Sequence, residues 1–255
     1  MIYDRREQIL SMLQKDGVVK VADLVRIFGV SIETIRRDLE ALEAEDLLKR
    51  GYGGAILKHH RSMEPAFTNR QEKNADDKYL IGRLASTFVE DGDVIAIDLG
   101  TTTMELAIAL KEKGTHVIAV TNSIPIAAEL SKSENAEVIM IGGYVRRGEL
   151  SVGGDVLTET NMRMFQTDKM FLGVGGITEN FGITDYRTEE AAFRRVGVER
   201  TQKVFALADH SKFGVTAMNH ICDLDKVDTL ITDGKTSKTM LNAIKERGVE
   251  VLVAE

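Results

Sequence analysis

The sequence predicts an α/β protein in two parts: a small helical module ending in a β-hairpin, and a larger domain with a mainly parallel sheet. In residues 1–58, apolar residues recur at helical spacing, and two short apolar runs around a glycine-rich turn follow them. In residues 77–255, short unbroken apolar runs alternate with helix-like stretches. Such runs are typical of strands buried on both faces, as in a parallel sheet covered by helices.

The composition limits the class of protein. A chain of 255 residues with 43% apolar residues supports one large or two modest domains with a buried core. Residues 1–58 hold ten basic and ten acidic residues, so the net charge of -7 comes from the remainder. The single cysteine, Cys222, excludes a disulfide within the chain. We find no apolar signal region and no run of about 18 apolar residues, and therefore expect a cytoplasmic, nucleoid-associated protein with no membrane partner.

The first module has the spacing of a helix-turn-helix. Residues 4–15 predict a first helix, which Gly17 ends because glycine adopts the left-handed conformation at little cost. Residues 20–28 predict a second helix, and Gly29 makes the tight turn before a third helix that begins at Ser31. A helix, a short glycine turn and a helix form a pattern typical of DNA-binding modules.

The third helix is expected to be amphipathic. One apolar stripe comprises Ile32, Ile35, Leu39 and Leu42. Arg37 lies opposite that stripe, and Ser31 caps the first turn. A front with Ser31, Thr34 and Arg37 suits base edges and phosphates in a DNA major groove, although an ordinary surface helix also directs charges outward. We expect Thr34 and Arg37 to contact bases or the groove, and Arg36 to contact phosphate or to pack within the module.

The stretch after Asp46, L-L-K-R-G-Y-G-G-A-I-L, predicts a hairpin that would be the wing of a winged helix. Its residues Lys49, Arg50 and Tyr52 are candidates for contacts with phosphates or the minor groove. Asp38 follows two arginines, so we expect it to pair with one of them or with a backbone group, the alternative being a solvated acid.

This module resembles the N-terminal domain of the DeoR family of bacterial transcription regulators. The family signature is matched at its spacing by Arg5, Ile9, Leu13, Ser31, Thr34, Ile35, Arg36, Arg37, Asp38 and Leu39. The Y-G-G-A after Arg50 resembles the wing of the family. The resemblance implies binding to double-stranded operator DNA.

Residues 59–76 contain Pro65 and lack a core pattern at their start, so we expect a linker that leads into a helix from about Asp76. His59 and His60 have no clustered cysteine or acid beside them, and we expect no metal site there. The expected strands that follow are 94–98, 117–121, 138–141, 170–174, 203–208, 229–232 and 249–253, with helices such as 104–113 and 189–200 between them.

Polar residues follow four of these strands, where ligands bind in open parallel sheets. The candidate ligand-binding residues are Asp98, Gly100, Thr101, Thr102, Thr103, Asn122, Ser123, Gly142, Gly143, Asp209 and Lys212. Three threonines at a helix start suit a phosphate, although they also suit a plain helix cap. Lys212 supplies positive charge to a phosphate, and Asp209 accepts hydrogen bonds from sugar hydroxyls.

The strand ends D-x-G-T-T-T, V-T-N-S, I-G-G and D-H-S-K-F-G resemble the DeoR effector-binding domain, a fold similar to ribose-5-phosphate isomerase. The resemblance covers nearly the whole chain and implies a phosphorylated sugar or related metabolite as effector, with no cofactor. The expected organisation is a DNA-binding domain at 1–58 with its helix-turn-helix at about 20–39, a linker at 59–76, and an effector-binding and oligomerisation domain at 77–255.

The alternative function is a sugar-phosphate isomerase-like enzyme with an accessory DNA-binding domain. Such an enzyme needs a base beside the substrate carbon. The relatives place an acid in a loop whose counterpart here is 168–177, and that loop has no acid at the position of the base. Glu179 and Asp185 lie further along and remain candidates. We expect no catalytic and no metal-binding residues.

The expected function is therefore that of a repressor of a sugar or carbohydrate catabolism operon, relieved by a phosphorylated sugar metabolite. One recognition helix reads only a few base pairs, so useful specificity requires repeated half-sites and a homo-oligomer, a dimer or a tetramer.

Overall fold

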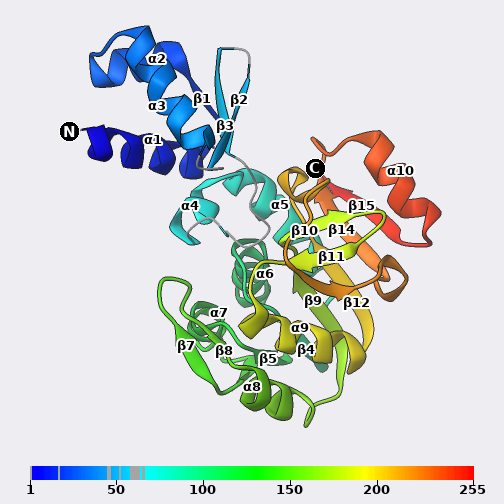
Figure 1. Cartoon of the computed structure of the whole chain (residues 1–255). Helices are drawn as coiled ribbons and strands as arrows, with labels where there is room; N and C mark the ends of the chain where they lie inside the picture. Colours follow the sequence, from blue (N-terminus) through cyan, green and yellow to red (C-terminus); the bar gives the residue numbers. More distant parts are fainter. Residues whose placement is uncertain (1, 17, 45–46, 52, 58–63, 65–66) are drawn as a thin grey trace. The chain divides into compact units, whose positions relative to one another are not determined.

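The computed structural model describes residues 2–16, 18–44, 47–51, 53–57, 64 and 67–255 (Figure 1). The chain divides into two compact units, Met1–Lys73 and Asn74–Glu255. Each unit has its own hydrophobic core and is considered by itself.

The first unit is a winged helix, as the sequence predicts. Its helices are α1 (Ile2–Asp16), α2 (Val21–Phe28) and α3 (Ile32–Ala44), and its strands are β1 (Val18–Lys20), β2 (Leu48–Gly51) and β3 (Gly54–Leu57). The strands form an antiparallel sheet in the order β1-β3-β2, so the wing is confirmed and β1 adds an unexpected third strand. The core consists of residues that the three helices and the wing share: Ile9, Leu13, Val19, Leu24, Ile35, Leu39, Leu42, Leu48 and Ala55.

The turn between α2 and α3 has the predicted geometry. Gly29 has φ 63°, in the left-handed region that favours glycine, and its N–H bonds to the carbonyl of Val25. The Ser31 Oγ accepts a hydrogen bond from the N–H of Thr34 at 3.2 Å, which caps α3. The expected linker contains one short helix among its described residues, α4 (Phe67–Glu72).

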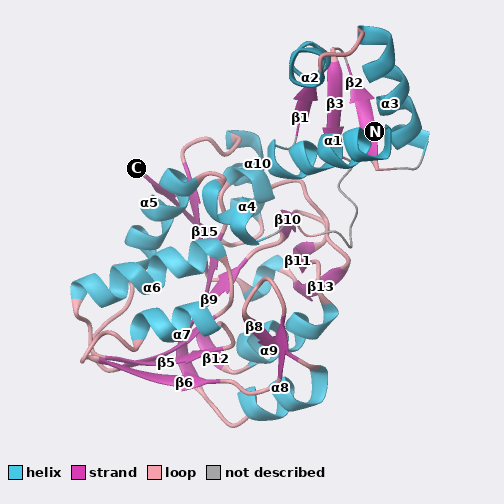
Figure 2. Ribbon diagram, turned by 90° about the vertical axis from the view of Figure 1, so that its left-hand side faces the viewer, coloured by secondary structure: helices cyan, strands magenta, loops and turns pink. Residues whose placement is uncertain are grey.

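The second unit is built on seven parallel strands in the order β15-β14-β12-β9-β4-β5-β6. Figure 2 colours the strands of the chain magenta and its helices cyan. Their bounds are β4 (Asp93–Ile97), β5 (Val117–Thr121), β6 (Ala136–Met140), β9 (Thr167–Gly173), β12 (Thr201–Leu207), β14 (Thr229–Asp233) and β15 (Glu250–Ala254). All seven strands were predicted, with bounds that differ by at most three residues. Every neighbouring pair is parallel, so the predicted sheet type is confirmed.

Helices cover both faces of this sheet. One core combines α5 (Ala75–Ser86), α6 (Thr101–Lys113) and α7 (Ile124–Leu130) with inward side chains such as Phe171 and Phe205. The other core combines α8 (Asp155–Met162), α9 (Thr188–Glu199) and α10 (Lys238–Glu246) with Met170 and Val204. Adjacent strand residues such as Met170 and Phe171 thus belong to opposite cores, as the alternation of side chains in a strand requires.

Two small antiparallel sheets were not predicted. One contains β10 (Gly176–Thr178), β11 (Gly182–Asp185) and β13 (Asn219–Cys222), and the other is the hairpin of β7 (Tyr144–Arg146) and β8 (Ser151–Gly153). Strands of three or four residues are too short to show a period of two in the sequence. Among the described helices, none has both the length and the apolar character needed to cross a membrane.

Candidate functional site

The exposed face of α3 carries the residues expected to contact DNA. Ile35, Leu39 and Leu42 are buried in the core of the first unit, whereas Ile32, expected on the same face, is 50% exposed. Ile32 lies in the first turn, beyond the reach of that core. Arg37 is exposed and forms no ion pair or hydrogen bond with any residue that the structure describes. Its guanidinium is therefore available to a partner.

Asp38 is not paired with Arg36 or Arg37, which corrects one expectation from the sequence. Its carboxylate is 3% exposed and accepts hydrogen bonds from Arg5 Nε at 2.6 Å and Arg6 Nε at 3.1 Å. Both arginines belong to α1, so the two ion pairs fix α3 against α1. Arg36 remains exposed, with its Nη1 3.8 Å from Glu33 Oε2.

Arg50 of the wing, a candidate for DNA contact, is paired with acidic residues of α3. Arg50 donates from Nε to Glu43 at 2.6 Å and from Nη1 to Glu40 at 2.7 Å. Hydrogen bonds to Glu43 and Glu40 raise the pKa of Arg50, and its charge is balanced within the module. Lys49 is exposed, and Tyr52 lies outside the described residues.

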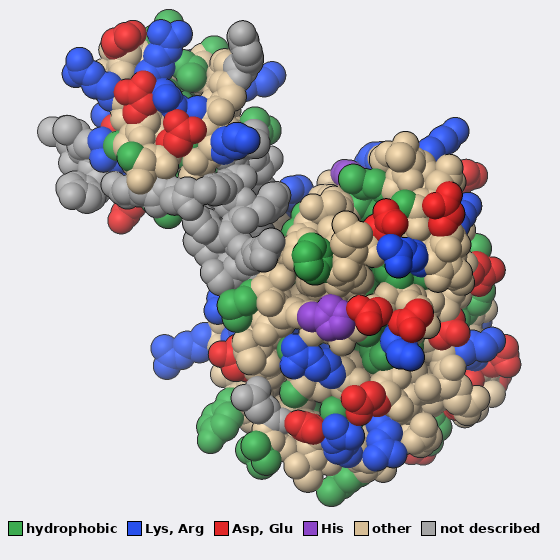
Figure 3. Space-filling view, turned by 45° about the vertical axis from the view of Figure 1, so that its right-hand side comes forward, with side chains coloured by type: hydrophobic (Ala, Val, Ile, Leu, Met, Phe, Trp, Pro, Cys, Tyr) green, Lys and Arg blue, Asp and Glu red, His purple; other side chains and the backbone are tan. Residues whose placement is uncertain are grey.

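A cleft of about 410 Å³ separates α3 from the wing, lined by Val21, Arg36, Leu39, Arg50, Gly51, Gly53 and Gly54. In a space-filling view, basic and acidic side chains are interleaved on the visible face of this unit (Figure 3). The visible face of this unit is therefore not uniformly basic.

In the second unit, the carboxyl ends of three strands are bonded to one another. Asp98, directly after β4, accepts a hydrogen bond at Oδ2 from the N–H of Gly173 in β9 at 3.1 Å. The N–H of Leu99 donates to Asn122 Oδ1, after β5, at 3.2 Å. The predicted polar residues after β4 and β5 thus lie at one edge of the sheet.

The other predicted residues of this edge have local partners as well. Thr101, Thr102 and Thr103 form the buried first turn of α6, and Thr103 Oγ1 donates to the carbonyl of Gly100 at 3.1 Å. Ser123 Oγ caps α7 by accepting from the N–H of Ile126 at 3.4 Å. The threonine-rich turn therefore has a structural role at the start of α6, and a bound anion would contact the same turn.

The two glycines after β6, Gly142 and Gly143, pack against other residues of the second unit. A Cβ on Gly143 would lie 2.5 Å from the carbonyl oxygen of Gly153, and a Cβ on Gly142 would lie 3.4 Å from Asn161. The close approach that Gly143 permits is that of β8. The structure gives these two glycines a packing role, and their expected contact with a ligand remains a prediction.

A buried charge network, absent from the sequence predictions, lies behind the strand ends. Arg194 of α9 donates from Nε to Asp98 Oδ2 at 2.7 Å, and its Nη1 lies 3.3 Å from Asp185 and 3.8 Å from Glu190. Burial raises the pKa of Asp98 to about 7, although Arg194 counteracts the shift. Burial alone would lower the pKa of Arg194, but the three carboxylates outweigh it and raise that pKa. The spacing of Glu190 and Arg194 on one helix face was the only signal in the sequence.

Asp209 lies at the end of β12 in a polar setting. Its Oδ1 accepts hydrogen bonds from Asn74 Nδ2 at 2.9 Å, from the N–H of Ser211 at 2.9 Å and from Ser211 Oγ at 2.5 Å. Burial alone would raise the pKa of Asp209, but the charge of Lys212 and the Ser211 donors outweigh it and hold that pKa below its ordinary value. An ionised carboxylate accepts hydrogen bonds from hydroxyl groups, and the expected contact of Asp209 with a sugar hydroxyl stays a prediction.

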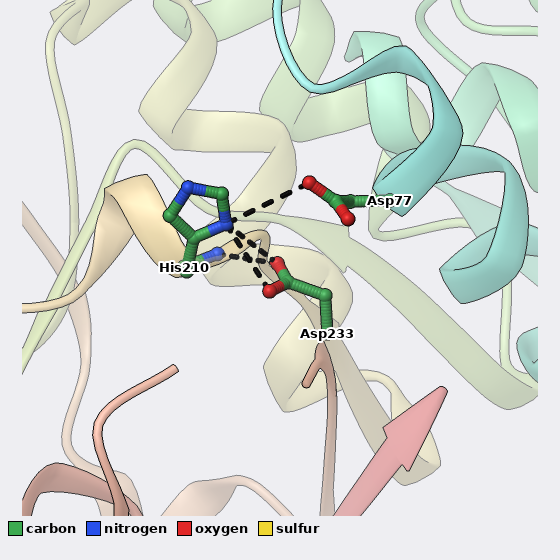
Figure 4. Close-up of side chains that lie close together, drawn as sticks. All are labelled: Asp77, His210 and Asp233. Atoms are coloured by element: carbon green, nitrogen blue, oxygen red, sulfur yellow. Dashed lines mark hydrogen bonds and ion pairs between the residues drawn. The ribbon is translucent and has the colours of Figure 1, made fainter. Parts of the chain in front are cut away.

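Asp77 of α5, His210 after β12 and Asp233 at the end of β14 lie close together (Figure 4). His210 Nδ1 is 3.1 Å from both oxygens of Asp233 and 3.8 Å from Asp77 Oδ2. Two carboxylates and an imidazole are ligands that transition metals accept. Lys235 Nζ, however, bonds to both oxygens of Asp77 at 2.8 and 2.7 Å, so the cluster already contains a cation of its own.

The two acids left as candidates for a catalytic base lie in different settings. Glu179 is exposed, with its Oε1 3.2 Å from Arg247 Nη2. Asp185 is buried, accepts from the N–H of Tyr186 at 2.6 Å and faces Arg194. Glu179 therefore lies apart from the buried network that includes Asp98, whereas Asp185 belongs to it.

The winged helix and the parallel sheet with polar strand ends together define a class, a DNA-binding regulator with a sensor domain. Two family models match the chain: the DeoR-like helix-turn-helix domain over residues 5–61 and the DeoR C terminal sensor domain over residues 73–234. The chain belongs to the DeoR family of transcription regulators.

Two full-length relatives agree with this assignment. A putative aga operon transcriptional repressor of Escherichia coli O157:H7 is 34% identical over 252 residues, which is 98% of this chain and 93% of that protein. A lactose phosphotransferase system repressor of Lactococcus lactis subsp. lactis is 32% identical over 244 residues, which is 95% of each chain. Among solved structures, ribose 5-phosphate isomerase A of Methanocaldococcus jannaschii matches with a TM-score of 0.41 and 17% identity over 56% of each chain.

Proposed function

We propose that this DeoR-family regulator represses an operon for sugar uptake or catabolism, and that a phosphorylated sugar bound to the second unit releases it from DNA. The observation that supports DNA reading by α3 is the exposed Arg37, on a helix that Asp38 fixes to α1. The two relatives are named as repressors, one of them for a lactose phosphotransferase system.

Operator reading is tested with Arg37→Ala. The DNA is first selected from random sequences by the wild-type protein, and affinities are then measured for that site and for singly altered sites. A lost bidentate contact to a base is worth about 1–3 kcal/mol, so we expect discrimination at one or two positions to fall by about 5-fold to 150-fold.

The matched control is Arg26→Ala, which removes the same charge from the exposed surface of α2. It should weaken binding to all sequences equally or leave it unchanged, because a phosphate contact has no sequence preference. Unaltered discrimination in Arg37→Ala would remove Arg37 from the reading face.

The effector site is proposed at the strand ends, with the phosphate at the start of α6 near Thr102 and Lys212 supplying positive charge. A thermal-shift screen of pentose and hexose phosphates against the wild-type protein identifies the effector, because a bound ligand raises the unfolding temperature. Thr102→Ala and Lys212→Ala should bind operator normally and lose the response to that effector. Lys226→Ala, an exposed lysine of the same unit, is the control and should respond normally. If both test variants respond like wild type, the phosphate binds elsewhere.

The regulator is proposed to act as a homo-oligomer and without catalysis or a cofactor. Two copies are needed to read repeated half-sites, and light scattering of the protein bound to operator gives the number. A hundredfold loss of DNA affinity requires about 2.7 kcal/mol of coupling between effector and operator. Segment 168–177, which runs through β9 into β10, has no acid at the position of the isomerase base. Turnover of pentose or hexose phosphates at enzyme-like rates would refute the non-catalytic assignment.

A further inference from the structure

A second cavity lies between the β7–β8 hairpin and the start of α9. It has a volume of about 390 Å³ and is lined by Tyr144, Val145, Arg146, Gly153, Gly154, Arg187, Glu189 and Glu190. None of these residues was among the ligand-binding candidates that the sequence predicted. The volume lies within the range of small-molecule sites in proteins.

The wall of this cavity contains a carboxylate that is only half satisfied. Glu190 is 1% exposed, and its Oε1 accepts hydrogen bonds from Arg146 Nη1 at 2.9 Å and Ser151 Oγ at 2.8 Å. Its Oε2 is buried and has no hydrogen-bond partner among the described residues. Arg187 Nε, also in the wall, is a buried donor in the same condition. Buried polar atoms of this kind are nearly always hydrogen-bonded to protein or water in native proteins, so each of these two atoms can form one further hydrogen bond.

The charges of the wall indicate which chemistry fits. Arg146 and Arg187 contribute two positive charges, and Glu189 and Glu190 contribute two negative charges. A wall with balanced charges disfavours a phosphate, which carries its own negative charge. A hydroxyl group both donates and accepts, so neighbouring hydroxyls on one molecule satisfy Glu190 Oε2 and Arg187 Nε together.

The cavity is connected to the strand ends through buried side chains. Arg194 bonds to Asp98 at the end of β4, and its Nη1 lies 3.8 Å from Glu190 Oε2. Asp98 Oδ1 and Arg194 Nη1 are likewise buried without hydrogen-bond partners among the described residues. A chain of buried charged groups thus runs from Asp98 at the end of β4 through Arg194 to Glu190 in the cavity wall.

We propose that this cavity binds the hydroxyl-bearing carbon chain of a polyhydroxylated ligand, with Glu190 Oε2 accepting from one hydroxyl and Arg187 Nε donating to another. The inference rests on the proposed function, in which the ligand is a phosphorylated sugar. The two parts of that ligand then bind at different places. The phosphate binds at the start of α6, and the hydroxyl groups bind in the cavity beside the β7–β8 hairpin. Specificity among sugar phosphates then resides in Glu190 and Arg187.

The test compares Glu190→Gln with Glu199→Gln, which alters the same helix outside the cavity. The amide introduced by Glu190→Gln would keep an acceptor for Arg146 and Ser151 but place an NH₂ where Oε2 stands, so it cannot accept from a hydroxyl. Glu199, also in α9, is exposed, does not line the cavity, and loses the same charge when replaced, which makes it a matched control. Affinities are measured by calorimetry for the sugar phosphate that most stabilises the wild-type protein, and by thermal shift for inorganic phosphate.

Glu190→Gln should bind that sugar phosphate at least 10-fold more weakly, whereas Glu199→Gln should bind it within twofold of wild type. Inorganic phosphate should bind both variants as it binds wild type. Each deoxy analogue of the sugar phosphate removes one hydroxyl. One analogue should cost wild type about 10-fold and Glu190→Gln nothing further, which identifies the paired hydroxyl.

Arg187→Lys provides a second variant if Glu190→Gln fails to fold, because it keeps the charge, lacks Nε–H and changes a partly exposed side chain. It should also lose about 10-fold for the sugar phosphate. Wild-type affinity in the variants that fold would overturn the inference while leaving the proposed function intact. If no sugar phosphate binds the wild-type protein, the proposed function fails, and the inference fails with it.

Discussion

Replacing Asp38 by Asn should destabilise the first unit selectively. The substitution keeps the size of the side chain and removes the charge that Arg5 and Arg6 share. Asp38 is 3% exposed at its side chain, whereas the two arginines are 16% and 28% exposed. The arginines can therefore regain water in the variant, and the loss is smaller than for a fully buried ion pair.

The magnitude follows from the two hydrogen bonds. A hydrogen bond to a charged group contributes about 1.5–3 kcal/mol, and a neutral one contributes about 1 kcal/mol. The amide introduced by Asp38→Asn would keep an oxygen that accepts from one arginine, whose guanidinium stays charged, and lose the bond to the other, which gives a loss of about 2 kcal/mol. For a domain of 60–100 residues, 1 kcal/mol changes the unfolding temperature by about 4–8 °C. The transition of the first unit should therefore move down by about 8–16 °C.

Differential scanning calorimetry of the full chain with and without operator DNA measures this change, because DNA stabilises the unit that binds it. The control is Asp23→Asn, which removes an equal charge from the same unit. Asp23 pairs with Arg26 at 3.0 Å, but their side chains are 49% and 80% exposed, and exposed pairs contribute about 0–1 kcal/mol. Equal shifts for the two variants would refute the assignment of Asp38 as the residue that fixes α3 to α1.

Two further predictions concern the second unit. A Cβ on Gly82 would lie 2.5 Å from the backbone carbonyl carbon of Glu105, so Gly82→Ala should push α5 away from α6. The free energy of unfolding, measured with denaturant, should fall by about 1–3 kcal/mol. The control Gly234→Ala, whose Cβ would have no atom closer than 4.0 Å, should change it little. Burial raises the pKa of Asp98 from 3.8 to about 7, so the folded chain holds this proton more tightly than the unfolded chain. The free energy of unfolding should then fall as pH rises from about 4 to about 7, by up to about 1.4 kcal/mol per pH unit, and Asp98→Asn should lack that contribution. If the difference in free energy of unfolding between wild type and Asp98→Asn is constant across this pH range, the prediction is wrong.

The sequence by itself determined the elements whose signal is local. Apolar spacing located the three helices of the first unit, and unbroken apolar runs located all seven strands of the parallel sheet. Gly29 marked the turn before α3 because only glycine adopts its φ of 63° at little cost. The polar residues after the strands could be assigned to one edge because parallel strands end together.

The tertiary structure alone decided which charges are buried and with what partners. Asp38 pairs with arginines 32 and 33 positions away, and Asp98 pairs with Arg194, 96 positions away. Placing Glu190 in a cavity wall also required the β7–β8 hairpin, whose strands of three residues show no period in the sequence. The physical reason is the cost of burying a charge: it requires a partner, and the fold determines which distant residue lies within hydrogen-bond distance.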